Sequence, residues 1–189
     1  MTFAWIPNAI CVVRILLVAP CALALLAGRY ELTLALFGVA AVSDGLDGWL
    51  AKSFGWTSRL GKILDPIADK LLLVTVFVTL VWLGLAPLWL VVTVVVRDVL
   101  IVGGAIAYRV LIGYIEGHPT AVSKLNTLLQ LSYVLAVIGA AAWRAVPPAL
   151  VVAVGAATFV TTVVSGIDYV LTYARQAIRA KRAAAPSAP

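Results

Sequence analysis

The chain is organised as long apolar stretches separated by short polar breaks. Several stretches of about 20 residues or more contain no Asp, Glu, Lys or Arg, and the longest runs from Leu71 to Val96. A helix of about 20 apolar residues can cross the hydrocarbon core of a bilayer while satisfying its own backbone hydrogen bonds. The pattern therefore predicts an all-α polytopic membrane protein. Six transmembrane helices are expected, at residues 7–27, 32–52, 64–84, 87–108, 122–143 and 148–172.

The chain changes character after the last of these spans. We expect the last helix to continue into a short basic helix, Tyr173 to Arg182, that lies at the lipid surface. Residues 183–189 are almost entirely Ala and Pro and are expected to be disordered. Residues 1–182 are thus predicted to form a single membrane domain.

The basic residues predict the orientation of the spans. One side of the predicted bundle carries most of them, namely Lys52, Arg59, Lys62, Arg109, Lys124, Arg175, Arg179, Lys181 and Arg182. The other side carries only Arg29 and Arg144. Since basic loops stay in the cytoplasm, both termini are expected to be cytoplasmic. The net charge of +6 is therefore interpreted as a match for anionic lipid and not for nucleic acid.

The composition also indicates which membrane contains the protein. Charged residues make up 12% of the chain, about half of their share in soluble domains. The use of Ala, Val and Arg, and the lack of a transit peptide, favour a bacterial inner membrane. A mitochondrial inner membrane is the alternative.

Four carboxylates interrupt the apolar pattern across the second and third predicted spans. They are Asp44, Asp47, Asp65 and Asp69, half of the eight acidic residues in the chain. Spacings of i, i+3 and i, i+4 place each pair on one face of its helix. Carboxylates near hydrocarbon cost on the order of a few kcal/mol unless they are compensated, and such oxygen ligands suit Mg²⁺ or Mn²⁺. The pattern predicts a divalent-metal site at the cytoplasmic membrane face, with a cation or proton transporter as an alternative of a different class.

The order of these residues resembles the signature of the CDP-alcohol phosphotransferase family. The matching run is Asp44-x-x-Asp47-Gly48-x-x-Ala51-Lys52, followed after eight residues by Gly61-x-x-x-Asp65-x-x-x-Asp69. That family usually has Arg at the position of Lys52, so the chain keeps the charge there but loses a bidentate hydrogen-bond donor.

The resemblance implies a homodimeric enzyme that uses two Mg²⁺ or Mn²⁺ ions and CDP-diacylglycerol, with CMP as the leaving group. By this resemblance, Asp44 and Asp65 would each bind both metals, Asp47 the first and Asp69 the second, and Asp69 would also be the catalytic general base. The residues that would hold the CDP moiety are Pro7, Asn8, Gly48, Lys52 and Ser58.

Other segments help to distinguish between two possible acceptor alcohols. The start of the first helix and the segment Leu64 to Lys70 resemble both phosphatidylglycerophosphate synthases and CMP-forming cardiolipin synthases. Three later segments favour the cardiolipin synthases, whose acceptor is phosphatidylglycerol: Val96 to Ile101, Ser123 to Gln130, and Ser165 to Tyr169. A phosphatidylglycerophosphate synthase, with glycerol 3-phosphate as acceptor, is the alternative.

Two arginines lie inside predicted spans, and Arg97 in the fourth span is too deep to be a topology flank. Arg97 either pairs with Asp98 or Asp168, or it holds the phosphate of the acceptor together with Lys124. Arg14 pairs with a carboxylate or with a lipid phosphate, and the sequence does not separate these two possibilities.

Overall fold

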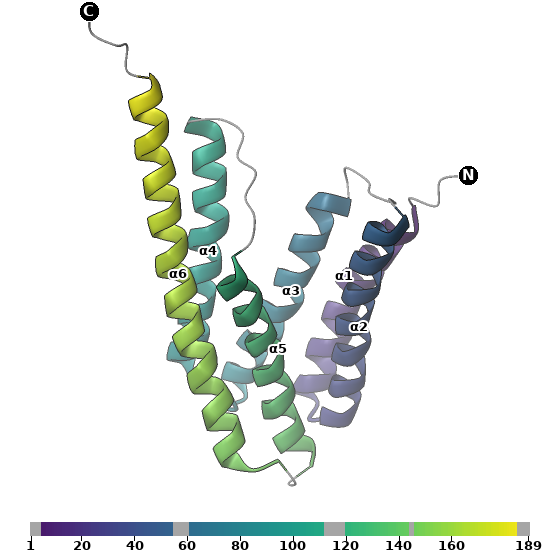
Figure 1. Ribbon diagram of the computed structural model, residues 1–189. Helices are drawn as coiled ribbons and strands as arrows, with labels where there is room; N and C mark the ends of the chain where they lie inside the picture. Colours follow the sequence, from purple (N-terminus) through teal and green to yellow (C-terminus); the bar gives the residue numbers. More distant parts are fainter. Residues whose placement is uncertain (1–4, 55–60, 112–119, 144–145, 185–189) are drawn as a thin grey trace, which may run out of the picture. The chain divides into compact units, whose positions relative to one another are not determined.

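The computed structural model describes residues 5–54, 61–111, 120–143 and 146–184, and it gives side-chain surroundings for residues 10–43, 68, 70–104, 120–143 and 146–173. Within these ranges the regular structure is entirely helical (Figure 1). The six helices are α1 (Trp5–Leu26), α2 (Tyr30–Phe54), α3 (Gly61–Trp82), α4 (Leu88–Leu111), α5 (Ala121–Ala142) and α6 (Pro148–Ala184). The predicted all-α class is confirmed, and every predicted span corresponds to one helix.

The helix at the end of the chain continues beyond the last span, as predicted. α6 is a single helix of 37 residues that includes residues 173–182 without a break. At 1.5 Å per residue it is about 55 Å long, well beyond the roughly 30 Å of a hydrocarbon core. The location of the basic segment at the lipid surface stays a prediction. The helix also takes in Ala183 and Ala184 from the predicted disordered tail, while residues 185–189 lie outside the described ranges.

Glycines end two of the helices in the same way. Gly28 and Gly84 have φ values of 70° and 69°, in the left-handed region. After α1, the N–H of Gly28 bonds the carbonyl of Leu25 and the N–H of Arg29 bonds that of Ala24. This pair of bonds is the Schellman pattern, which satisfies the last carbonyls of a helix and needs a residue without a Cβ at its centre. The turns that follow α1 and α3 thus depend on these two glycines.

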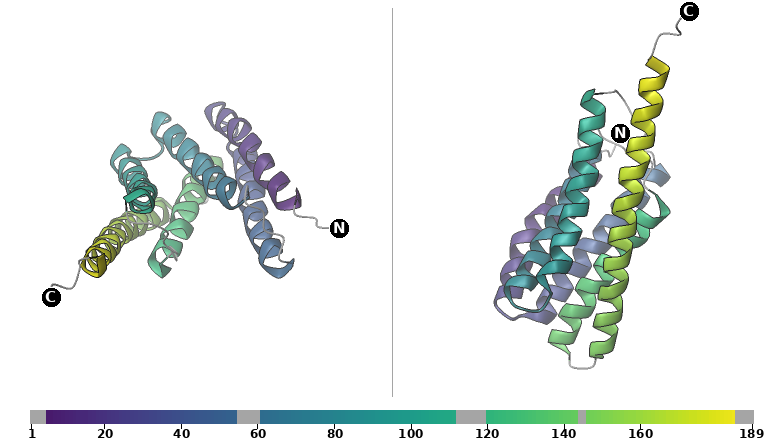
Figure 2. Two further views of the ribbon diagram at one scale, coloured as in Figure 1. Left: turned by 90° about the horizontal axis from the view of Figure 1, so that it is seen from above. Right: turned by 90° about the vertical axis from the view of Figure 1, so that its left-hand side faces the viewer.

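The chain divides into two compact units. The first contains α1, α2, α3, the end of α5 from Val134 and the start of α6 up to Val151. In it α1 packs against both α2 and α3, and the three helices lie side by side in both further views (Figure 2). The second unit contains α4, α5 up to Tyr133 and α6 from Val152. The prediction of a single domain stays a prediction.

The described residues expose more large apolar side chains than a water-soluble protein does. Large apolar side chains are exposed along every helix, for example Leu16 and Leu23 on α1 and Val152 on α6, which are 66–71% exposed. Polar side chains such as Arg14 and Gln130 are buried. Extended apolar surface of this kind marks contact with a partner or a membrane. By length and composition, two described helical segments could cross a membrane, Ala121–Ala142 and Pro148–Tyr173.

Candidate functional site

The four aspartates of the acidic motif lie on two helices of the first unit. Asp44 and Asp47 are in the second half of α2, and Asp65 and Asp69 are in the first half of α3. Asp47 lies seven residues before the end of α2 and Asp69 lies eight residues after the start of α3, which corresponds to about 10–12 Å at 1.5 Å per residue. Their helical spacing is therefore as predicted, and the two pairs share a similar depth. The directions of the four side chains lie outside what the structure describes.

Other residues expected to bind the nucleotide are distributed around the same ends of these helices. Pro7 and Asn8 fall in the first turn of α1, while Gly48 and Lys52 follow the first acidic pair on α2. α1 and α2 are joined by a tight turn and run antiparallel, so the start of α1 and the end of α2 lie at the same end of the unit. Ser58 lies outside the described residues.

Arg14 lies at a depth on α1 that matches the acidic motif. It is nine residues from the start of the helix, or about 14 Å, on the helix that packs against both α2 and α3. Its side chain is only 1% exposed. A buried guanidinium needs an anionic or hydrogen-bonding partner, because its desolvation is costly. Surrounding bilayer lipid does not reach a side chain so enclosed, so the burial favours the carboxylate over the lipid phosphate as the partner of Arg14.

The residues of the acidic motif fit the chemistry of a hard divalent cation. Four carboxylates supply only oxygen ligands, which Mg²⁺ and Mn²⁺ prefer. Among the side chains that the structure describes, no group of three His, Cys, Asp or Glu gathers as an alternative metal site. The four aspartates are not among those side chains, so their ligand set remains a prediction from the motif.

A second cluster of polar side chains surrounds Arg97 in the second unit. Arg97 Nη1 donates to Asp98 Oδ1 at 2.8 Å, and Nη2 donates to the hydroxyls of Ser123 and Ser165, each at 2.6 Å. Arg97 and Asp98 are 5% and 7% exposed. The structure thus shows Arg97 paired with Asp98. It also brings together the three segments whose sequences favour the cardiolipin synthases, on α4, α5 and α6.

Polar side chains continue away from Arg97 along α5 and α6. Asn126 accepts hydrogen bonds at its Oδ1 from the hydroxyls of Thr161 and Thr162, at 3.0 and 2.8 Å. Ser123, Asn126 and Gln130 are spaced by three and four residues and so share one face of α5. We call the set Arg97, Ser123, Asn126, Gln130, Thr162 and Ser165 the buried polar strip.

The buried polar strip has more hydrogen-bond donors than acceptors. Within the part of the chain that the structure describes, no partner is present for the donors Arg97 Nε, Asn126 Nδ2 and Gln130 Nε2, or for the single acceptor Gln130 Oε1. The hydroxyls of Ser123 and Ser165 accept from Arg97, so their own protons remain available to a further acceptor. Buried polar groups are almost always paired in folded proteins. An acceptor-rich ligand such as a phosphate group would satisfy the donors around Arg97.

Lys124 and Gln130 belong to the same segment of α5, and the structure describes the surroundings of both. Lys124 is exposed and directly follows Ser123, near the start of α5. It therefore lies next to a residue that contacts Arg97, as the prediction of a shared acceptor site requires. Gln130 belongs to the segment Ser123 to Gln130, but no sequence pattern indicates that its amide is fully buried and has no partner among the described residues. Only the three-dimensional packing reveals such a group.

Comparison with known proteins supports the same family as the acidic motif does. A family model described as CDP-alcohol phosphatidyltransferase matches residues 4–174. A probable cardiolipin synthase (CMP-forming) of Drosophila melanogaster is 29% identical over 182 residues, which cover 88% of this chain and 56% of the relative. A cardiolipin synthase (CMP-forming) of Homo sapiens is 32% identical over 152 residues, covering 71% of this chain and 50% of the relative.

A relative with a different acceptor in its name is also similar. The chloroplastic CDP-diacylglycerol–glycerol-3-phosphate 3-phosphatidyltransferase 1 of Oryza sativa is 40% identical over 121 residues, covering 55% of this chain and 36% of the relative. The chain thus spans about half the length of the curated relatives it matches. Similarity to the fly and human cardiolipin synthases extends over more of the chain, while the higher identity to the rice protein is confined to a shorter part.

Proposed function

Since the chain belongs to the CDP-alcohol phosphatidyltransferase family, we propose that it is a membrane-embedded cardiolipin synthase of the CMP-forming type. It transfers the phosphatidyl group of CDP-diacylglycerol to the free glycerol hydroxyl of phosphatidylglycerol and releases CMP. The observation that carries this proposal is the complete acidic motif on α2 and α3, in a chain whose similarity to cardiolipin synthases covers up to 88% of its length.

In this proposal the acidic motif binds two divalent metal ions. Asp44, Asp47, Asp65 and Asp69 would hold the ions, with Asp44 and Asp65 shared between both, Asp47 on the first and Asp69 on the second. When bound, Mg²⁺ or Mn²⁺ neutralises diphosphate charge and makes CMP a better leaving group. Asp69 accepts the proton of the attacking hydroxyl as general base. The new P–O bond forms to the acceptor oxygen as the P–O bond to CMP breaks.

The nucleotide is held by residues at the same ends of α1 and α2. Pro7, Asn8, Gly48, Lys52 and Ser58 bind the CDP moiety. Glycine at position 48 permits close approach of a phosphate to the helix backbone. Lys52 contributes a positive charge as a single flexible donor where Arg would provide a planar fork.

The buried polar strip is the proposed site for the phosphate of the acceptor. Arg97 provides a cation that is 5% exposed, and its Nε is free of acceptors among the described residues. The Ser123 and Ser165 hydroxyls add two donors beside it, and Lys124 adds a second cation. Charge-assisted hydrogen bonds to a phosphodiester are about twice as strong as neutral ones, so this donor set favours an anionic acceptor.

Glycerol 3-phosphate is the second candidate acceptor. It also carries a phosphate, and the 40% identity to the rice glycerol-3-phosphate 3-phosphatidyltransferase favours it. The donors of the buried polar strip would suit either phosphate. Membership in an enzyme family argues against the cation or proton transporter hypothesis.

The acceptor is identified by offering each one separately to the purified full-length protein. Labelled CDP-diacylglycerol is supplied with phosphatidylglycerol or with glycerol 3-phosphate, and the lipid product is identified by mass spectrometry. We expect cardiolipin and stoichiometric CMP from the first mixture, and neither product from Asp69→Asn. Product formed only from glycerol 3-phosphate would overturn the cardiolipin synthase assignment.

The proposed setting is the bacterial inner membrane, with six spans, both termini and the active site on the cytoplasmic side, and a homodimer as the working assembly. The native Cys11 and Cys21 side chains are fully buried, so they give little background in cysteine labelling. A cysteine placed at Arg29 should react with an impermeant maleimide from outside intact cells, and one placed at Ser187 should not. The reverse pattern would contradict the orientation.

A further inference from the structure

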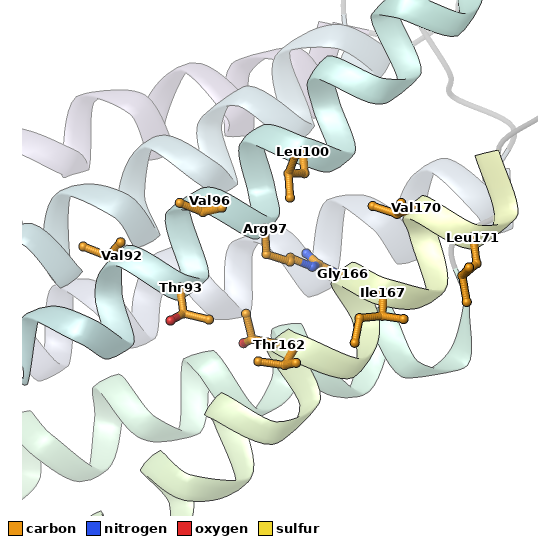
Figure 3. Close-up of a pocket in the computed structure, with 11 residues that line it drawn as sticks. Val92, Thr93, Val96, Arg97, Leu100, Thr162, Gly166, Ile167, Val170 and Leu171 are labelled. Carbon is orange, nitrogen blue, oxygen red and sulfur yellow. The ribbon is translucent and has the colours of Figure 1, made fainter. Parts of the chain in front are cut away.

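A groove runs between α4 and α6 within the second unit (Figure 3). Its volume is about 530 Å³, inside the roughly 300–1,000 Å³ range of ligand sites. Eleven residues line it: Val92, Thr93, Val96, Arg97, Leu100, Thr162, Val163, Gly166, Ile167, Val170 and Leu171. The walls are thus almost wholly apolar and contain a single charged side chain.

The groove is elongated along both helices. Its residues on α4 recur every three or four positions from Val92 to Leu100, and those on α6 recur likewise from Thr162 to Leu171. At 1.5 Å per residue each wall is about 12–14 Å long. Gly166 leaves room in the groove because it has no side chain. A Cβ at this position would lie 3.6 Å from Arg97 Cγ. The shape fits a chain-like apolar ligand better than a compact one.

The groove opens to the exposed surface of α4 and α6. Val96, Leu100 and Ile167 are 51–55% exposed although they line it. In a membrane these faces of α4 and α6 contact lipid, so a lipid chain can enter sideways without crossing a polar surface. A water-soluble acceptor has no use for an apolar entrance of this kind.

Arg97 connects the groove to the buried polar strip. Its aliphatic stem lies against Gly166 (Figure 3), and its guanidinium reaches the hydroxyls of Ser123 and Ser165. One side chain thus presents an apolar surface to the groove and a cation to the donor-rich cluster. A ligand that satisfies both has an anionic head and a hydrocarbon tail.

We propose that the α4–α6 groove binds one acyl chain of the acceptor phospholipid, with its phosphodiester at Arg97. The acceptor role rests on the proposed function, whereas the lipid site rests on the groove and on Arg97 alone. The inference makes the acceptor a diacyl anionic lipid and assigns acceptor selection to α4 and α6.

Photolabelling of the full-length protein in mixed-lipid nanodiscs tests the site without relying on turnover. The probe is phosphatidylglycerol with a diazirine in one acyl chain, and the control probe is phosphatidylcholine with the same chain. We expect the phosphatidylglycerol probe to label peptides containing Val92–Leu100 and Thr162–Leu171, and unlabelled phosphatidylglycerol to compete. Equal labelling by the phosphatidylcholine probe would show ordinary bilayer contact and would overturn the proposal.

Variants that fill the groove give a second, matched comparison. Ile167→Trp occupies the groove, whereas Val164→Trp adds the same bulk on the same helix at a position that is 47% exposed and does not line it. Ile167→Trp should lower labelling by phosphatidylglycerol roughly tenfold, since overpacking excludes the chain, and Val164→Trp should leave it unchanged. Val96→Trp, on the facing wall, repeats the test if the first variant folds poorly.

The outcomes separate the two proposals. Cardiolipin synthesis that survives both Ile167→Trp and Val96→Trp with an unchanged KM for phosphatidylglycerol would refute the groove as the acceptor site. Specific labelling of the groove by a protein that forms no cardiolipin would instead uphold the lipid site and overturn the proposed reaction.

Discussion

Arg97 on α4 donates a 2.6 Å hydrogen bond from Nη2 to the hydroxyl of Ser165 on α6, which lies 68 residues later in the sequence. The same nitrogen bonds Ser123 on α5, so one guanidinium links three helices of the second unit. With Asp98 as its ionic partner, Arg97 is both a structural connector and the only charged residue among the described residues that line the groove. Its two roles can be separated experimentally.

We predict that Arg97→Gln destabilises the protein by about 3–5 kcal/mol, because it removes a buried cation that is paired with the buried Asp98 carboxylate. The double variant Arg97→Gln with Asp98→Asn removes both charges and should recover most of that loss. Thermal unfolding in detergent, followed for the wild type and the two variants, measures the difference.

The double variant also isolates the role of Arg97 in binding. If Arg97 holds the acceptor phosphate, the KM for phosphatidylglycerol should rise by roughly tenfold or more, as expected for loss of a charge-assisted hydrogen bond. The KM for CDP-diacylglycerol should change little. An unchanged KM for the acceptor in the folded double variant would leave Arg97 with a structural role only.

Replacement of Gln130 is predicted to increase stability, in contrast to Arg97→Gln. Its amide is fully buried, and within the described residues neither its nitrogen nor its oxygen has a partner. Gln130→Leu should therefore raise the free energy of unfolding of the ligand-free protein by about 1–3 kcal/mol. It should also reduce the stabilisation that added phosphatidylglycerol produces, as measured by thermal unfolding with and without the lipid.

Thr158 is the matched control for Gln130. Its hydroxyl is also fully buried, but it donates to the carbonyls of Leu129 and Val154 at 3.1 and 2.8 Å. Thr158→Val should lower stability by about 0.5–1.5 kcal/mol, because it removes a satisfied hydrogen bond. Destabilisation by Gln130→Leu of the same size would mean that its amide is already satisfied.

Metal dependence provides a test of the acidic motif. Chelation of divalent ions should abolish CMP release, and Mg²⁺ or Mn²⁺ should restore it, because four carboxylates form an oxygen-only ligand set. Asp69→Asn should remain inactive after metal is restored, since an amide cannot accept the proton of the hydroxyl. Manganese binding, followed by electron paramagnetic resonance, should persist in this variant. Turnover by Asp69→Asn would refute its assignment as the general base.

A close contact between α5 and α6 gives a prediction about packing. A Cβ on Gly155 would lie 2.9 Å from Cε2 of Tyr133, a ring that is only 3% exposed. Gly155→Ala should therefore cost about 1–3 kcal/mol, as is typical of overpacking. Gly103→Ala, where no described atom lies within 4 Å of the added Cβ, should instead be neutral or stabilise the helix by up to about 1 kcal/mol. Equal effects in thermal unfolding would contradict the close contact.

The sequence by itself determined the helices, because apolar runs of membrane length and glycines such as Gly28 and Gly84 are local signals. It also determined the acidic motif, since i, i+3 and i, i+4 spacings act within one helix. The continuation of α6 into the basic segment was also predicted, because a change from apolar to basic residues alters the environment of a helix without breaking its backbone hydrogen bonds.

Only the tertiary structure decided which partners the deep polar residues meet. The sequence left Arg97 between an ion pair and a phosphate site, and packing placed it against Asp98, Ser123 and Ser165 at once. The groove beside it likewise depends on the distance between α4 and α6 and on the missing side chain of Gly166. Contacts between residues far apart in the chain are set by how helix surfaces fit together, and no spacing within a single helix encodes that fit.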